Sequence, residues 1–97
     1  MNKIALGAGI KEDRFGKMEW MSMIKAETSK AILLFAMAKE EGKIYKAEKW
    51  LPKSQIKING DIIEIPDWLE YKLLYSGLLD DFFYVYNHAL KIYEGEQ

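Results

Sequence analysis

Lys30–Glu41, with the sequence K-A-I-L-L-F-A-M-A-K-E-E, decides the fold because it is compatible with either kind of secondary structure. Its Ala, Leu, Met, Lys and Glu residues favour a helix, which Thr28 could cap. A continuous apolar run of this length is also typical of a strand in the middle of a sheet. Glu41-Gly42 predicts a turn, after which Ile44–Leu51 would pair back as a strand. Periodicity alone leaves both assignments open.

The segment before it, Glu19–Thr28, favours a strand. Trp20, Ser22 and Ile24 fall on one side of such a strand, while Met21 and Met23 fall on the other. Neither side is purely polar, so the pattern does not say which side faces a core.

The segment Ile56–Ile65, I-K-I-N-G-D-I-I-E-I, has the clearest local pattern in the chain. Its isoleucines alternate on both arms around Asn59-Gly60. This pair is favoured in two-residue type I′ turns because both central positions need a positive φ. The sequence therefore predicts a β-hairpin here.

Two helices are predicted after the hairpin. Pro66-Asp67 suits a first helical turn, and Gly77 suits a stop. Leu78–Tyr93 carries apolar residues at helical spacing and predicts an amphipathic helix, with a strand over Phe82–Tyr86 as the alternative. Residues 94–97 should fray. Residues 1–17, with three glycines and no clear period, predict a weakly ordered lead-in.

Composition predicts one folded domain. The chain has 97 residues, of which 49% are hydrophobic and 30% charged, a balance typical of a globule. We expect residues 18–65 to form the sheet and residues 66–93 the helical part. No apolar run approaches the roughly 20 residues that a bilayer requires, and no secretory signal pattern is present. Together with the absence of cysteine, this predicts a cytoplasmic protein without membrane contact.

Charge is divided unevenly along the chain. Residues 1–57 hold 12 Lys/Arg and 7 Asp/Glu, a net of +5, whereas residues 58–97 hold 2 Lys and 8 Asp/Glu, a net of −6. Opposite halves of this kind can neutralise each other within the fold. The alternative is that they support head-to-tail self-association or contact with a charged partner.

Three motifs resemble a group of short bacteriophage and prophage proteins. They are E-T-S-K-A-I-L-L at Glu27–Leu34, W-L-P-K-S-Q-I at Trp50–Ile56 and I-P-D-W-L at Ile65–Leu69. The group has the pattern E-T-x-K-A-[IV]-L, W-[ILF]-P-K-S-Q-[IV] and [IV]-P-x-W-[LF], and carries no assigned biochemical function. The resemblance covers about residues 19–74.

The resemblance implies a strand for Lys30–Met37, paired with the strand that leads into W-L-P-K-S-Q. We therefore expect an α+β fold. It would be a small antiparallel sheet or half-open barrel of four or five strands, with one or two C-terminal helices covering one face.

Catalytic residues are few. His88 is the single histidine and has no Cys or second His with which to build a usual zinc site. Asp80 and Asp81 point about 100° apart on a helix and do not converge on one ligand. Ser54 beside Lys53 lacks the strand–turn–helix elbow of a G-x-S-x-G nucleophile. The sequence predicts no enzyme, no cofactor and no metal site.

A basic and aromatic segment suggests one binding function. Lysines interleaved with rings can track phosphates and stack on bases, so the segment is a candidate site for single-stranded nucleic acid. Strand parity puts its two rings on opposite faces, however, which favours a solvated edge with core rings instead. The residues concerned are Lys43, Tyr45, Lys46, Lys49, Trp50, Lys53 and Lys57.

The acidic, aromatic C-terminal half suggests a second binding function, contact with a protein. Surface tyrosines favour protein–protein contact, although core rings look the same in sequence. The candidate protein-binding residues are Asp80, Asp81, Tyr84, Tyr86 and Tyr93. We expect a phage or mobile-element accessory protein that binds a host or phage protein, for example to inhibit a host defence system, with a homo-oligomer as a further option. The alternative is a single-stranded nucleic-acid-binding protein.

Overall fold

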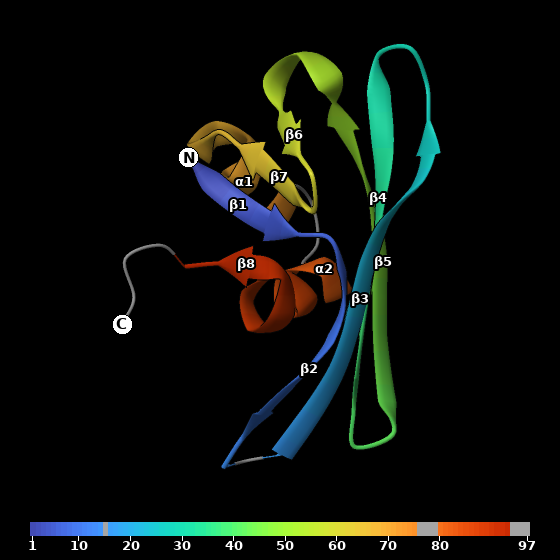
Figure 1. Cartoon of the computed structure of the whole chain (residues 1–97), viewed down its shortest axis with the longest axis vertical. Coiled ribbons are helices and arrows are strands. Elements are labelled where there is room, and N and C mark those ends of the chain that lie inside the picture. The colour runs from blue at the N-terminus through green and yellow to red at the C-terminus, as the bar shows by residue number, and fades with distance from the viewer. Residues whose placement is uncertain (15, 76–79, 94–97) are drawn as a thin grey trace.

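The computed structural model describes residues 1–14, 16–75 and 80–93, and shows two antiparallel four-stranded sheets together with short helical elements. The large sheet has the order β2-β3-β4-β5, and the small sheet the order β6-β7-β1-β8. Figure 1 shows the small sheet and the helices on the same side of the large sheet. The α+β class is confirmed, with the strands divided between two sheets. The large-sheet strands are β2 (Gly7–Asp13), β3 (Gly16–Glu27), β4 (Ala31–Glu40) and β5 (Lys43–Pro52).

The small sheet draws its strands from both ends and the middle of the described chain. They are β1 (Asn2–Ala5), β6 (Lys57–Asn59), β7 (Ile62–Ile65) and β8 (Lys91–Ile92). The helical elements are η1 (Lys53–Gln55), α1 (Asp67–Tyr75), α2 (Asp81–Val85) and the π-helical turn η2 (Tyr86–Leu90). Among the described residues, no helix has both the length and the apolar character needed to cross a bilayer.

Ala31–Glu40 of the segment Lys30–Glu41 form the strand β4, in agreement with the strand that the resemblance implied for Lys30–Met37. β4 lies in the interior of the large sheet and pairs along its length with β3 and β5, which together satisfy its backbone groups. The turn at Glu41-Gly42 is also confirmed, with φ of 50° and 78° at the two positions. Thr28 caps no helix. Its hydroxyl oxygen accepts from the Ala31 N–H at 3.0 Å in the turn between β3 and β4.

The prediction of a weakly ordered lead-in was wrong, because residues 2–13 form β1 and β2. β1 pairs with β7 and β8, and β2 pairs with β3. Gly7, at a φ of 128°, lies where the chain passes from one sheet to the other. The Ser22 hydroxyl donates to the Ala5 carbonyl beside this crossing. These pairings join segments far apart in sequence, which local periodicity does not register.

The hairpin at Ile56–Ile65 is confirmed, but its turn lies one residue later than predicted. Asn59 pairs with Ile62, so Gly60-Asp61 form the two-residue loop. Only Gly60 has a positive φ, 58°, which matches a type II′ turn rather than type I′. The Asn59 side chain instead donates to the Glu64 carboxylate at 2.6 Å.

The first helix begins at Asp67 after Pro66, as predicted. The second does not extend over Leu78–Tyr93. α2 begins at Asp81, and the helical backbone ends at Leu90, after which β8 pairs with the edge of β1. Lys91 and Ile92, which were predicted to be helical, instead pair with the open edge of β1. The predicted stop at Gly77, the start at Leu78 and the frayed end at residues 94–97 lie outside the described residues.

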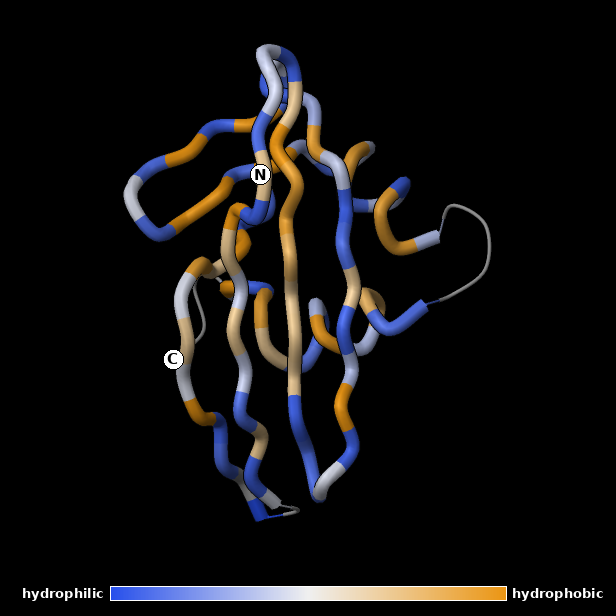
Figure 2. Tube along the Cα trace, turned by 90° about the vertical axis from the view of Figure 1, so that its right-hand side faces the viewer, coloured by the Kyte–Doolittle hydropathy of each residue, from blue (hydrophilic) through white to orange (hydrophobic). Residues whose placement is uncertain are grey.

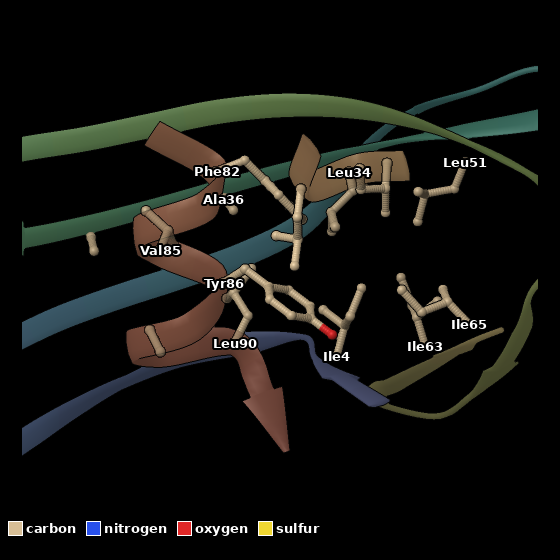
Figure 3. Close-up of a cluster of buried hydrophobic side chains, with 14 of the residues drawn as sticks. Ile4, Leu34, Ala36, Leu51, Ile63, Ile65, Phe82, Val85, Tyr86 and Leu90 are labelled. Carbon is tan, nitrogen blue, oxygen red and sulfur yellow. The ribbon is translucent and has the colours of Figure 1, made fainter. Parts of the chain in front are cut away.

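The core lies between the two layers (Figure 3). Phe82, Tyr86 and Leu90 of α2 and η2 point from the helical side toward Leu34 of β4 and Ile4 of β1. All five side chains have no exposed surface. Burial of a large apolar side chain contributes about 1.5–3 kcal/mol, so this layer holds the helices on one face of the large sheet.

Candidate functional site

The two aspartates predicted to bind a protein partner hold α2 against β5. Asp80 caps α2 by accepting from the Phe82 N–H at 2.9 Å, and its other oxygen lies 2.7 Å from Lys49 Nζ. Burial opposes the charged form of Asp80, but the hydrogen bonds from Lys49 and Phe82 outweigh it and hold its pKa below the usual 3.8. Asp81 accepts from the backbone N–H of Lys46 at 3.2 Å.

The three predicted tyrosines do not form one surface. The Tyr84 ring stacks on Tyr45 with centroids 4.3 Å apart, and its hydroxyl donates to Glu40 at 2.5 Å. Tyr86 is fully buried and donates to Glu70, so desolvation and the nearby carboxylate raise the pKa of Tyr86. Tyr93 is exposed. Tyr86 is therefore a core residue here, and Tyr84 is half-buried in the same layer.

The residues of the basic and aromatic segment lie on two faces and two sheets. The parity argument is confirmed: Tyr45 packs against the core side, while Trp50 is 52% exposed on the opposite side. Lys49 is paired with Asp80. Lys53 is paired with Glu27, Lys57 lies on β6, and the Lys43 ammonium lies over the Tyr45 ring. Of the set, Lys46 and Trp50 share one face of β5. The fold brings no continuous cationic platform together, and the nucleic-acid alternative stays a prediction.

His88 lies at a cleft on the core side of the large sheet. The cleft, of about 410 Å³, is lined by Lys11, Glu12, Gly16, Met18, Glu40 and His88. The His88 ring packs on Tyr84 with centroids 4.2 Å apart. None of the lining side chains is a hydroxyl or thiol nucleophile. In the described part of the chain, no three His, Cys, Asp or Glu side chains gather in a way that could hold a metal ion.

The other side of the large sheet is uncovered, and sequence reasoning did not single it out. We call it the open face. Figure 2 looks onto it, with β4 apolar along most of its length. β4 alternates strictly: Ile32, Leu34, Ala36 and Ala38 are buried, while the residues between them point outward. The apolar side chains of the open face are Ile10, Met21, Met23, Leu33, Phe35, Met37, Ile44 and Trp50.

Pairing across the strands arranges these side chains in rows. Met21 is opposite Met37, Met23 is opposite Phe35, and Leu33 is opposite Trp50. Residues directly opposite in an antiparallel pair share a face and are in contact. Together the three rows make an apolar strip along β3, β4 and β5. Isolated exposed apolar residues are ordinary, but a contiguous patch is typical of an interaction surface.

Charged side chains interrupt and border the strip. Lys25 lies over the Phe35 ring at 5.5 Å and pairs with Glu48 at 3.2 Å. A shallow hollow of about 370 Å³ lies here, lined by Lys25, Phe35, Lys46, Ala47 and Glu48. Beyond the strip, Glu19 and Lys39 are directly opposite each other. The surface thus has an apolar centre with both charge signs around it, which is the usual anatomy of a protein interface.

One sequence signal could have located this face. Once Lys30–Glu41 is taken as a strand, Leu33, Phe35 and Met37 must point away from Leu34 and Ala36. Strands that are apolar on both faces are usually covered on both faces.

In comparisons with protein-family models, curated proteins and solved structures, nothing was found that matches this chain. The surfaces described above are therefore the basis for a proposed function.

Proposed function

We propose that this protein is a non-enzymatic protein-binding module that acts through the open face. The observation that carries the proposal is the two-sided apolar character of β4. Its inward residues are covered by α2, η2 and the small sheet, whereas Leu33, Phe35 and Met37 are partly exposed and no other layer of the described chain packs over them. Exposing such a strip to water is unfavourable, and a partner that covers it gains about 25 cal/mol for each Å² buried.

The chemistry of the face favours a protein over other ligands. Acidic and basic side chains alternate on it, for example Glu48 beside Lys46 and Glu19 beside Lys39, whereas nucleic acid selects a uniformly positive surface. Three methionines, Met21, Met23 and Met37, give it the adaptable side chains found on protein-binding surfaces. Trp50, exposed at one end, is of the residue type most often found at interface hot spots.

The resemblance of residues 19–74 to short phage and prophage proteins supports a role as an accessory protein of a phage or mobile element. The partner would then be a host or phage protein, and inhibition of a host defence system would be one outcome of binding. The matching motif at Trp50–Ile56 begins on the open face and continues into η1, so Trp50 belongs to both observations.

The five methionines of the chain offer a direct test. Met21, Met23 and Met37 lie on the open face, Met18 is 6% exposed in the core of the same sheet, and Met1 is 67% exposed at the N-terminus. The folded protein is treated briefly with dilute hydrogen peroxide, and sulfoxide formation at each methionine is followed by mass spectrometry. The reaction is run in an extract of the cells that express the protein and in serum albumin at equal total protein.

We expect the three open-face methionines to oxidise several-fold more slowly in the extract than in albumin. Met1 should react equally in both, and Met18 should resist oxidation in both. Equal oxidation of Met21, Met23 and Met37 in extract, in albumin and in concentrated purified protein would show that nothing covers the face, and the proposal would be wrong.

A further inference from the structure

The charged end of the open face is complementary to itself. Ile10, Glu19, Lys39 and Ile44 form one row across the four strands, because each is directly opposite the next. The row has an isoleucine at each end and opposite charges on the two central strands. Reversing its order exchanges Glu19 with Lys39 and Ile10 with Ile44. A row with this property can face its own copy without placing like charges together.

On the two central strands the next two rows match in the same way, while the outer strands bring Lys46 of one copy over Ala8 of the other. Met21 of β3 is opposite Met37 of β4, and Met23 is opposite Phe35. Exchanging β3 and β4 therefore places methionine on methionine and methionine on phenylalanine. Methionine against an aromatic ring is a favourable contact that is worth about 0.3–1.5 kcal/mol. Charge and apolar character thus match under a single exchange of the two central strands.

We propose that the open face packs against the open face of a second copy, about a two-fold axis that runs parallel to the strands between β3 and β4. This inference rests on the proposed role of the face as a protein-binding surface and names a second copy as an occupant, which a host or phage partner would displace. Under the rotation β3 lies over β4 of the second copy. Glu19 meets Lys39 of the second copy, Met21 meets its Met37 and Met23 meets its Phe35. Two-fold interfaces are the commonest in soluble oligomers, and aligned sheets pack in this way.

The other two-fold arrangement does not fit. An axis perpendicular to the strands would keep the strand order but reverse the strand direction. It would place the Glu19 and Lys39 end of the face over the Leu33 and Trp50 end of the second copy. Two charges would then lose water against apolar side chains, which is costly. The sequence of the face therefore favours an axis parallel to the strands over one perpendicular to them.

The size of the face suits a dimer. The face has four strands, spaced about 4.8 Å apart. Each is about nine residues long with a rise of about 3.3 Å per residue, so the face covers about 600 Å². Two copies would bury about 1,200 Å², the lower end of the range for specific interfaces. A reversible dimer that forms at micromolar concentration is the expectation, because small interfaces of this kind are seldom permanent.

A mixing experiment tests the arrangement. Glu19→Lys and Lys39→Glu each create a row of like charges, so each variant should repel its own copy and dimerise roughly tenfold or more weakly than wild type at low salt. In an equimolar mixture, every contact across the axis again joins opposite charges. One variant is labelled uniformly with 15N, and native mass spectrometry should then show a mixed dimer whose mass lies between those of the two homodimers. The pair Glu19–Lys39 within each chain stays broken in the mixture, so recovery reports on contacts between chains only.

Matched controls carry the same charge changes elsewhere. Asp61→Lys and Lys57→Glu lie in the exposed β6–β7 hairpin of the small sheet and should leave dimerisation unchanged. A wild-type chain that stays monomeric at millimolar concentration would overturn this inference. The proposed function would survive that result if the methionines were still protected in extract. A wild-type dimer whose two self-repelling variants gain nothing on mixing would place the interface elsewhere and also overturn it.

Discussion

The two faces of the large sheet are built from the same four strands but reach opposite outcomes. On β4 the inward residues Ile32 and Leu34 are at most 1% exposed, because α2, η2 and the small sheet cover them. The outward residues Leu33 and Phe35 are about as apolar, yet no described element lies over them (Figures 1 and 2). The inward face therefore stabilises the monomer, and the outward face is the one that we propose to bind a partner.

Charged side chains explain how the open face can remain exposed to water although no layer of the chain covers it. Lys25, Glu48 and Lys46 surround the Phe35 ring, and their stems shield part of its surface. On the inward face the buried hydroxyl of Ser22 donates to the Ala5 carbonyl, so this polar group is satisfied within the chain. Mixed charge around an apolar strip keeps it soluble while leaving it accessible to a partner.

The largest expected effect compares two adjacent leucines. Leu34→Ala should lower the free energy of unfolding by about 2–5 kcal/mol, because it opens a cavity in a fully buried site. Leu33→Ala should cost less than about 1 kcal/mol, because the site is already partly in water. Urea unfolding at submicromolar protein, where the proposed dimer is dissociated, measures both. Equal losses would mean that the outward face also contributes to the stability of the monomer.

A second prediction concerns the close contact of Gly9 with Trp20 on the inward face. A Cβ at Gly9 would lie 2.9 Å from the Trp20 Nε1 atom and 3.2 Å from two ring carbons. Gly9→Ala should therefore destabilise the fold by about 1–3 kcal/mol through overpacking. In a Trp20→Leu background the same change should cost much less, because the ring is gone. A loss that is unchanged in that background would assign it to the backbone rather than to the ring.

Much of the fold could be predicted from the sequence where the signal was local. The turn at Glu41-Gly42, the isoleucine alternation around Asn59 and the helix start at Pro66 each depend on neighbouring residues, and all were confirmed. The prediction of β4 as a strand depended on the resemblance, because the composition of this segment favours a helix. β1, β2 and β8 were missed, since they owe their structure to pairing with segments far away in sequence.

The candidate site was harder to predict because it depends on which side of each strand is covered. Tyr84 and Tyr86 were candidate binding residues because core and interface rings look alike in sequence, but Tyr86 is core and Tyr84 packs on Tyr45. Alternation along β4 shows that Leu33 and Phe35 face away from Leu34. It does not say on which side the helices pack, and that depends on the whole fold.

Tyr86→Phe tests the covered side at its deepest polar contact. It removes the hydroxyl that donates to the Glu70 carboxylate. That carboxylate also forms an ion pair with Lys91, whose Nζ lies 3.2 Å from it. We expect a loss of about 1–2 kcal/mol at neutral pH in urea unfolding, because the carboxylate stays paired. Tyr84→Phe, in a half-buried site, should cost less. A larger loss for Tyr84 would contradict the ranking by burial.

The same variant has a pH signature. The unfolded chain releases a tyrosine proton near pH 10, while in the folded chain the pKa of Tyr86 is raised above its usual 10.0. Stability due to this group is thus present below pH 10 and falls as the pH rises further. The stability of wild type and Tyr86→Phe should therefore converge between pH 10 and 11. A constant gap over that range would show that Tyr86 ionises as readily in the fold as in the unfolded chain.

The smallest effect is expected where the covering layer is tied to the edge of the large sheet. Asp80→Asn keeps the α2 cap, because asparagine caps as well as aspartate, but removes the charge that pairs with Lys49. The side chain of Asp80 is 47% exposed, so the loss at pH 7 should be below about 1 kcal/mol. Asp80→Ala loses the cap as well and should cost about 1 kcal/mol more.

Acid separates the two contributions of Asp80. Its pKa is depressed in the fold, so its charge contributes stability that is present above the unfolded value of 3.8 and lost as the pH falls through the lower folded value. Thermal unfolding of wild type and Asp80→Asn should therefore differ at pH 7 and converge as the pH falls below the folded pKa of Asp80. Because the capping hydrogen bond does not need the charge, Asp80→Ala should stay less stable than both at every pH. A gap between wild type and Asp80→Asn that persists in acid would mean that geometry, and not the ion pair with Lys49, holds α2 to β5.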